Sequence, residues 1–235
     1  IETTANTTTE SDSTDTTDNT STSAKALKAG NEVNISGGEF KIDSADDSVH
    51  SNGNIVITGG NISVASGDNG MHADGNLTIS DGTVDITKSY EGIEGSIVTI
   101  DGGTISVVAS DDGINCAGGS DTGSTDRMGA DQFSSQDGVE LNINGGTVTI
   151  DADGDGLDSN GNFTMAGGTV CVCGPTNGGN GALDYNGTAT VTGGTLIACG
   201  AVGMEEGFGD NSTQYSVLHD LGSTVSANEK LTITD

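Results

Sequence analysis

Residues 54–64 read NIVITGGNISV, two short apolar segments on either side of a glycine pair. The alternating apolar residues of the two segments are Ile55, Ile57, Ile62 and Val64. Alternation with a period of two is typical of a β-strand with one buried face. A glycine pair allows a sharp corner between two such strands, because glycine adopts backbone conformations closed to other residues. This stretch therefore predicts two short strands joined by a tight bend.

The same arrangement recurs along most of the chain. Its corners are Gly37-Gly38, Gly59-Gly60, Asp81-Gly82, Gly102-Gly103, Gly145-Gly146, Gly167-Gly168 and Gly193-Gly194. The corners are almost evenly spaced, apart from one interval of about double length between the fourth and the fifth. That interval contains one repeat and an insertion at 118–138. A near-constant period of this kind indicates a solenoid, in which each repeat forms one coil.

Each repeat carries a third short segment with an inward-facing apolar residue. These residues are Val49, Met71, Ile93, Ile114, Leu157 and Leu183. Three short strands per repeat of about 22 residues predict an all-β, right-handed parallel β-helix of about seven coils. Coils spaced about 4.8 Å apart would stack equivalent residues into ladders. Such ladders explain how a chain with only 31% hydrophobic residues could form a core.

The composition divides the chain into two parts. Residues 1–23 are almost entirely Thr, Ser, Asn, Asp and Glu, which predicts a disordered linker that tethers the domain at the cell surface. A plain disordered tail is the alternative. Residues 24–235 are predicted to form a single β-helix domain with an inserted loop at 118–138.

The two ends of this domain depart from the repeat. Residues 24–30 are expected to form a short helical turn. From about residue 205 we expect a C-terminal cap, with strands at 215–221 and 230–235.

The net charge limits the partners. Six Lys and Arg against 35 Asp and Glu give a formal charge of −29. Nucleic acid and anionic membrane would be repelled unless a cation lay between them and the protein. No apolar run is long enough for direct membrane insertion. We expect a monomer located outside the cell.

Polar residues around the third segment fall into columns. The residues after the inward apolar position are His50, His72, Glu94, Asn115, Asp158 and Asp184. Carboxylates about 4.8 Å apart repel by roughly 1 kcal/mol even in water, and calcium, which binds 6–8 oxygens, would relieve this repulsion. The predicted calcium ligands are Glu91, Glu94, Asp111, Asp112, Asn115, Asp153, Asp155, Asp158 and Asp184. A solvated acidic edge is the alternative. His50 and His72 are interpreted as polar surface residues rather than transition-metal ligands.

Residues 151–162 contain half of an EF-hand loop. Asp151, Asp153 and Asp155 match its first acidic positions, but the twelfth position is Asn162 instead of glutamate. The flanking sequences TVTI and NFTM have strand character. We therefore interpret this stretch as one coil of the solenoid.

Three strings resemble a known family. They are GDGLDSNG (154–161), GPTNGGNGALDYNG (174–187) and STQYSVL (212–218). They are similar to bacterial secreted carbohydrate-binding domains, which are calcium-binding right-handed β-helices and look like family-nine pectate lyases. The resemblance implies binding of plant cell-wall polysaccharide, including acidic pectic chains, with calcium as a structural and bridging ion. Asp111, Asp112 and Asn115 resemble the DDxxD calcium motif of the lyases, with Asn as the last residue.

A lyase would need a Lys or Arg base near the calcium. No Lys or Arg lies between Arg127 and Lys230, so Lys88 and Arg127 are the only substitutes near the acidic residues. We therefore expect non-catalytic, calcium-dependent binding of pectic or cellulosic polysaccharide, with Lys88, Tyr90 and Arg127 as candidate carbohydrate contacts. A lyase acting on polygalacturonate and a structural or adhesive surface protein remain the alternatives.

Two cysteines occupy equivalent positions of adjacent repeats. The Cα atoms of Cys173 and Cys199 are expected about 4.8 Å apart, which is within disulfide range. The spacing leaves open whether a bond forms.

Overall fold

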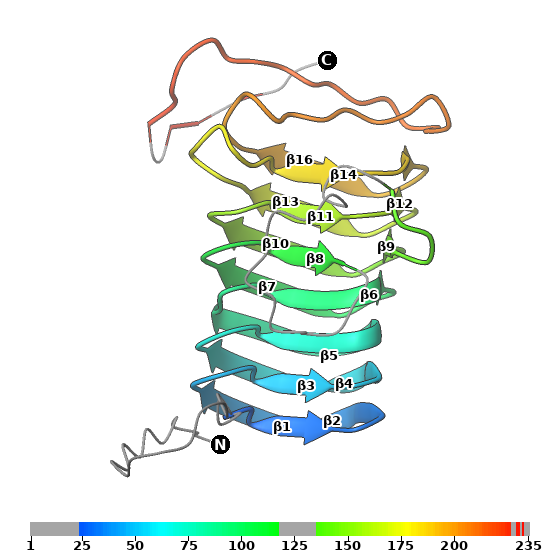
Figure 1. Ribbon diagram of the computed structural model, residues 1–235. Coiled ribbons are helices and arrows are strands. Elements are labelled where there is room, and N and C mark those ends of the chain that lie inside the picture. Colours follow the sequence, from blue (N-terminus) through cyan, green and yellow to red (C-terminus); the bar gives the residue numbers. More distant parts are fainter. Residues whose placement is uncertain (1–23, 118–134, 227–228, 231, 233–235) are drawn as a thin grey trace, which may run out of the picture.

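The computed structural model describes residues 24–117, 135–226, 229–230 and 232, and its regular elements are all β-strands (Figure 1). The described residues contain no helix long and apolar enough to span a membrane. The strands are β1 (Leu27–Ala29), β2 (Glu32–Ser44), β3 (Val49–Ser51), β4 (Asn54–Ser66), β5 (Met71–Lys88), β6 (Ile93–Ile100), β7 (Thr104–Ala109), β8 (Ile114–Cys116), β9 (Glu140–Ile143), β10 (Thr147–Ala152), β11 (Leu157–Ser159), β12 (Asn162–Met165), β13 (Thr169–Cys173), β14 (Leu183–Tyr185), β15 (Ala189–Val191) and β16 (Thr195–Cys199).

The strands stack into a parallel β-solenoid (Figure 1). One face follows the order β14-β11-β8-β6-β5, and a second continues as β5-β7-β10-β13-β16. A third face is formed where β9 pairs with β6 and β12, and β12 pairs with β15. All of these pairings are parallel and join equivalent residues of neighbouring coils. The predicted all-β solenoid, with about seven coils of about 22 residues each, is confirmed.

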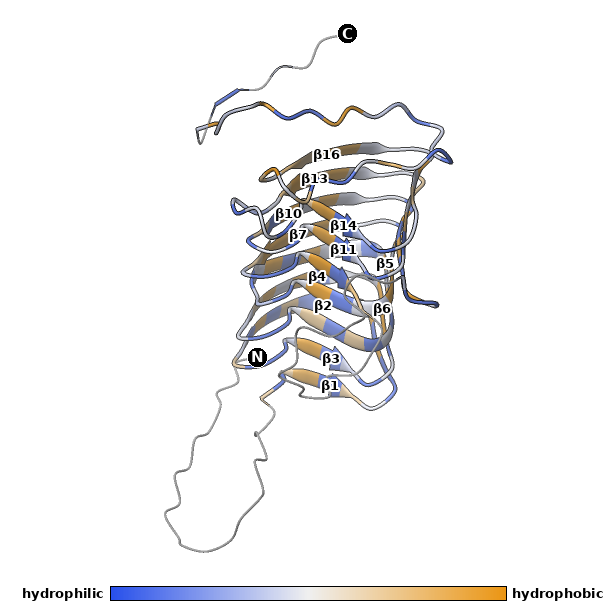
Figure 2. Ribbon diagram, turned by 45° about the horizontal axis from the view of Figure 1, so that its top comes forward, coloured by the Kyte–Doolittle hydropathy of each residue, from blue (hydrophilic) through white to orange (hydrophobic). Residues whose placement is uncertain are grey.

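Inward-facing apolar residues form continuous ladders through the coils. One ladder runs through Ile57, Ile79, Ile100, Ile143 and Met165, which occupy paired positions of successive coils and are fully buried. Figure 2 shows hydrophobic residues recurring along the stacked strands from one coil to the next. Burial of about 25 cal/mol per Å² of apolar surface stabilises the stack. No coil could bury its apolar side chains without its neighbours.

The corners require glycine at the second position of each pair. The second glycines all have a positive φ, as at Gly60 (107°) and Gly146 (79°). A Cβ at Gly146 would also lie 2.9 Å from the backbone of Gly102 in the neighbouring coil. The first position has no positive φ, and Asp81 occupies it in one repeat, but a Cβ at Gly145 would still lie 2.3 Å from Asp101 O.

The long interval between glycine pairs does not interrupt the stack. Strand β9 pairs with β6, with Val98 opposite Leu141, so the coil resumes in register after the insertion. The predicted loop at 118–138 lies mostly outside the described residues, as does the predicted linker at 1–23.

The expected helical turn at 24–30 is wrong. Residues 27–29 form β1, which pairs with β3 so that Leu27 lies opposite Val49. Leu27 packs against the core, and this packing overrides the helix propensity of the local sequence. The repeat thus begins one strand earlier than the sequence indicated.

The predicted strand at 215–221 is also wrong. The described chain forms no strand there, and Tyr215, Val217 and Leu218 are exposed. A preceding segment does contact the last coil: Gly209 N donates to Ala189 O at 3.0 Å, and Phe208 packs against the core. Of the second predicted strand, 230–235, residues 231 and 233–235 lie outside the described part.

The corner geometry predicts the effect of a single methyl group. Gly146→Ala should lower the free energy of unfolding by about 1–3 kcal/mol, because alanine is strained at positive φ and its Cβ would collide with Gly102. Urea denaturation would measure the change. Gly37→Ala is the matched control, since a Cβ there has nothing within 4 Å. Equal stability of the two variants would contradict the proposed role of the corner.

Candidate metal-binding site

The face that contains β3, β8, β11 and β14 aligns its polar residues in one column, as predicted. Parallel register places His50 opposite His72 and His72 opposite Glu94. The column continues through Asn115, Asp158 and Asp184 on β8, β11 and β14. The side chains of adjacent coils are therefore neighbours, although a whole repeat or more separates their residues in the sequence.

Three carboxylates converge in the C-terminal half of this column. Oxygens of Asp112, Asp155 and Asp158 lie within 4.8 Å of one another. Asp158 is on β11, whereas Asp112 and Asp155 lie in the turns before β8 and β11. Asp155 N donates to Asp112 Oδ1 at 2.7 Å, and Gly113 N donates to Asp155 O at 2.8 Å. Hydrogen bonds between coils thus join the turns of Asp112 and Asp155, and the pairing of β11 with β8 brings Asp158 alongside them; we call these three residues the acidic trio.

The protonation behaviour of the acidic trio reflects its concentration of negative charge. Burial, followed by the charges of Asp155 and Asp111, raises the pKa of Asp112 to about 7. Burial and the charges of Asp184 and Asp111 raise the pKa of Asp155 to about 6, although a hydrogen bond from Gly181 N opposes the shift. The pKa of Asp158 is raised well above 3.8 by burial and by the charge of Asp112. A bound cation would favour the charged forms and so oppose these shifts.

Two further oxygens near the acidic trio have unfilled hydrogen-bonding capacity. Glu91 Oε2 and Asn115 Oδ1 are buried and have no hydrogen-bond partner among the described residues. Burial, and then the charges of Glu94 and Asp112, raise the pKa of Glu91, which a hydrogen bond with Asn115 opposes. Buried oxygens without partners are costly. Carboxylate and amide oxygens are the donors that calcium prefers, so the residues present fit this ion.

Of the remaining predicted calcium ligands, some lie near the acidic trio and others do not. Asp111 and Asp184 lie close enough to raise the pKa of Asp158. Asp153 has an exposed side chain and stays outside the trio. Glu94 lies toward the N-terminal half of the column, with its Oε2 3.4 Å from His72 Nδ1.

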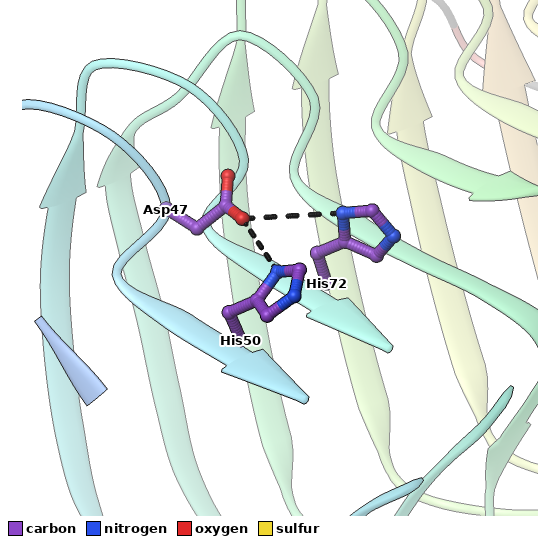
Figure 3. Close-up of side chains that lie close together, drawn as sticks. All are labelled: Asp47, His50 and His72. Carbon is purple, nitrogen blue, oxygen red and sulfur yellow. Dashed lines mark hydrogen bonds and ion pairs between the residues drawn. The ribbon is translucent and has the colours of Figure 1, made fainter. Parts of the chain in front are cut away.

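A second group lies around Asp47, His50 and His72 (Figure 3); its two histidines were predicted to share one column, but they were not joined to Asp47. The two histidines were expected at the surface, and this expectation is wrong: both are buried. Their rings stack edge to face across adjacent coils, with centroids 4.9 Å apart, and the turn that carries Asp47 lies against them. The available signal was the equivalent position of the two histidines in consecutive repeats, with Asp47 shortly before the first.

The candidate carbohydrate contacts lie beside the acidic turns. Lys88 is exposed at the end of β5, and Tyr90 is half-buried. Asp111 N donates to Tyr90 O at 2.9 Å, which places Tyr90 one coil before Asp111 and Asp112. Arg127 lies outside the described residues.

The two cysteines of the last coils are register partners, as expected. Cys173 lies opposite Cys199, and both side chains are exposed. They are free thiols in this structure.

The raised pKa values of the trio predict how metal-free protein responds to pH. Each group binds its proton more tightly in the folded chain than at its ordinary pKa of 3.8, so its ionisation destabilises the fold. The free energy of unfolding should fall as the pH rises from about 4 to about 7. Asp112→Asn should reduce this fall, measured by urea denaturation in chelator across that range. Asp43→Asn, at an exposed position, is the control. The same slope in Asp112→Asn and the unsubstituted chain would contradict the assignment.

The comparisons with known proteins identify one family. No curated protein and no solved structure matches the chain. A family described as carbohydrate-binding domain-containing protein matches residues 2–70 and 71–181, which together cover more than half of the sequence. That match suggests a carbohydrate ligand, while the resemblance to pectate lyases stays a prediction. The chain belongs to the family of carbohydrate-binding domain-containing proteins.

Proposed function

We propose that this protein binds plant cell-wall polysaccharide in a calcium-dependent, non-catalytic manner. The observation that carries the proposal is the convergence of Asp112, Asp155 and Asp158 within 4.8 Å. Two buried oxygens nearby, Glu91 Oε2 and Asn115 Oδ1, have no hydrogen-bond partner in the described part of the chain. Membership of a carbohydrate-binding family supports the class of ligand.

Calcium is the ion that this donor set favours. The trio and its two neighbours offer only oxygen, and calcium takes 6–8 oxygen ligands from carboxylates, amides and water. Bound calcium would supply positive charge that offsets the repulsion among the carboxylates. Asp111 and Asp184 would contribute to the same negative field, because their charges already act on Asp158.

The net charge favours an acidic polymer bound through the cation. A polyuronate would be repelled by a protein with a formal charge of −29 unless a cation lay between the two. The trio is only partly buried, so an ion held there would keep positions open to a sugar carboxylate. A cellulose-binding platform usually presents several exposed aromatic rings, but the sequence has no Trp, and Phe163 is buried. We therefore place acidic, pectic chains ahead of cellulosic ones.

Lys88 and Tyr90 supply a surface beside this site. The ammonium group of Lys88 is exposed and could pair with a uronate, while the ring of Tyr90 could pack against a sugar. Both lie one coil before Asp111 and Asp112. A linear chain running along the column would meet these side chains and the acidic turns in succession.

The scarcity of suitable bases supports binding without catalysis. The coils from β9 to β16 carry no Lys or Arg, since none lies between Arg127 and Lys230 in the sequence. A lyase base would have to come from Lys88 or Arg127. Lys88 is exposed at the end of β5.

A location outside the cell agrees with this ligand and ion. Cell-wall polysaccharide lies outside, and calcium sites of extracellular modules commonly need about 10⁻⁴–10⁻³ M calcium. We propose that the Thr- and Ser-rich N-terminal residues tether the domain at the surface.

Calcium binding can be tested on the trio directly. Asp112→Asn and Asp158→Asn should each weaken calcium binding by at least roughly tenfold, since even the loss of an outer-shell partner costs that much. Isothermal titration calorimetry at neutral pH would measure the change. Asp43→Asn removes the same charge at an exposed position and should bind calcium normally. Unchanged affinity in both trio variants would show that calcium binds elsewhere or not at all.

Polysaccharide binding needs a separate measurement. We expect retention on immobilised polygalacturonate in calcium, release by chelator, and loss of retention in Asp158→Asn. Cellulose serves as the neutral comparison, and preferential retention there would overturn the acidic specificity. Near-ultraviolet absorption after incubation with polygalacturonate and calcium would reveal unsaturated product. Its appearance would contradict the non-catalytic assignment.

A further inference from the structure

The N-terminal half of the polar column contains a compact group of unlike donors. His50 lies on β3 and His72 on β5, in consecutive coils, and Asp47 precedes β3 (Figure 3). Asp47 Oδ2 lies 2.8 Å from His50 Nδ1 and 3.9 Å from His72 Nδ1. The three ligand atoms are within 4.8 Å of one another, and all three residues are buried.

A fourth donor comes from the next coil. Glu94 Oε2, at the start of β6, lies 3.4 Å from the same His72 Nδ1 that faces Asp47. On the other side of the ring, His72 Nε2 lies 3.5 Å from Asp74 Oδ1. A carboxylate beside the second ring nitrogen is the usual companion of a metal-ligating histidine, because it fixes the ring and its tautomer.

The chemistry of these donors differs from that of the acidic trio. Calcium prefers oxygen ligands alone. Imidazole nitrogen combined with carboxylate oxygen suits zinc and other first-row transition metals, commonly with four ligands in zinc sites. The two halves of one column thus present donors for two different classes of cation.

A lysine supplies positive charge beside Asp47. Lys25 Nζ contacts Asp47 Oδ2 and lies 3.2 Å from Asp46 Oδ1. Burial would raise the pKa of Asp47, but hydrogen bonds from His50 and Lys25 and the charge of Lys25 hold it below 3.8. Asp47 is therefore an anion inside the fold. Its oxygen faces the lysine and both imidazoles, so an ammonium group and a metal ion would compete for it.

We propose that Asp47, His50, His72 and Glu94 form a binding site for a first-row divalent transition metal such as Zn²⁺, distinct from the acidic trio. The ion would join three consecutive coils, since its ligands come from β3 and the turn before it, from β5 and from β6. Lys25 is the internal competitor that balances Asp47 when no metal is bound. The site is independent of the proposed polysaccharide function.

The test uses the full chain and two metals with different roles. Cys171, Cys173 and Cys199 are replaced by serine throughout, so that thiolates contribute no signal. Calcium is present in excess, so that it competes with the probe for oxygen-only ligands such as the acidic trio. Co²⁺ is the probe, because its visible absorption reports nitrogen and oxygen ligands, and Zn²⁺ is the competitor. We expect one equivalent of Co²⁺ to bind and Zn²⁺ to displace it.

Substitutions then assign the ligands. His50→Ala and His72→Ala should each weaken Co²⁺ binding by at least roughly tenfold. His219→Ala, at the exposed third histidine, should leave binding unchanged. Lys25→Met should strengthen binding several-fold, because it removes the competing ammonium group. Unchanged circular dichroism and an unchanged urea unfolding midpoint would show that each variant is folded.

Three results would overturn the proposal. The first is the absence of Co²⁺ uptake by the chain with both histidines intact. The second is full uptake by folded His50→Ala or His72→Ala. The third is weaker Co²⁺ binding by Lys25→Met, because the metal and the ammonium group could then not share the carboxylate of Asp47. Any of these would leave the group as an ion-pair network around Lys25.

Discussion

Parallel backbone pairing between coils is the constraint on which the rest of this structure depends. Each coil donates and accepts hydrogen bonds with the coils on either side, as where Leu157 N donates to Ala182 O at 3.1 Å. The pairing keeps successive repeats in register, so most strand residues lie next to their own equivalents. Apolar residues thereby become ladders and glycine pairs become a row of corners. A single property of one repeat is multiplied along the axis.

The same register also stacks residues of like charge, which is unfavourable. Acidic residues that would repel weakly in a loop are stacked along the polar column, and burial raises their pKa values. The fold can tolerate this only by protonation, by internal cations such as Lys25, or by bound metal ions. Donor type changes along the column, from His50 and His72 to Asp158 and Asp184. The two proposed ion sites therefore offer different donors at different positions along the axis.

The fold could be predicted from the sequence because each repeat by itself contains the alternating apolar residues and the glycine corner, as in Ile55, Ile57 and Gly60. Strand β1 was missed because Leu27 precedes the first glycine pair, and only its stacking on Val49 reveals the strand. The column of polar residues was predicted, but its separation into the acidic trio and the group around Asp47, His50 and His72 was not. Whether Asp153 or Asp155 points toward Asp112 depends on the backbone geometry of the turn, which the spacing of residues in the sequence does not predict. Burial of the histidines depends likewise on how the turn at Asp47 folds.

The last described strand, β16, has a consequence for behaviour in concentrated solution. It pairs on one side only, with β13, and Ile197 is 53% exposed. An open parallel edge is a template for any other strand, including that of another molecule, so end-to-end filament growth is its intrinsic hazard. The formal charge of −29 provides colloidal repulsion against such growth. Salt and multivalent cations screen that repulsion, so the ionic composition of the surroundings also governs whether the protein stays dispersed.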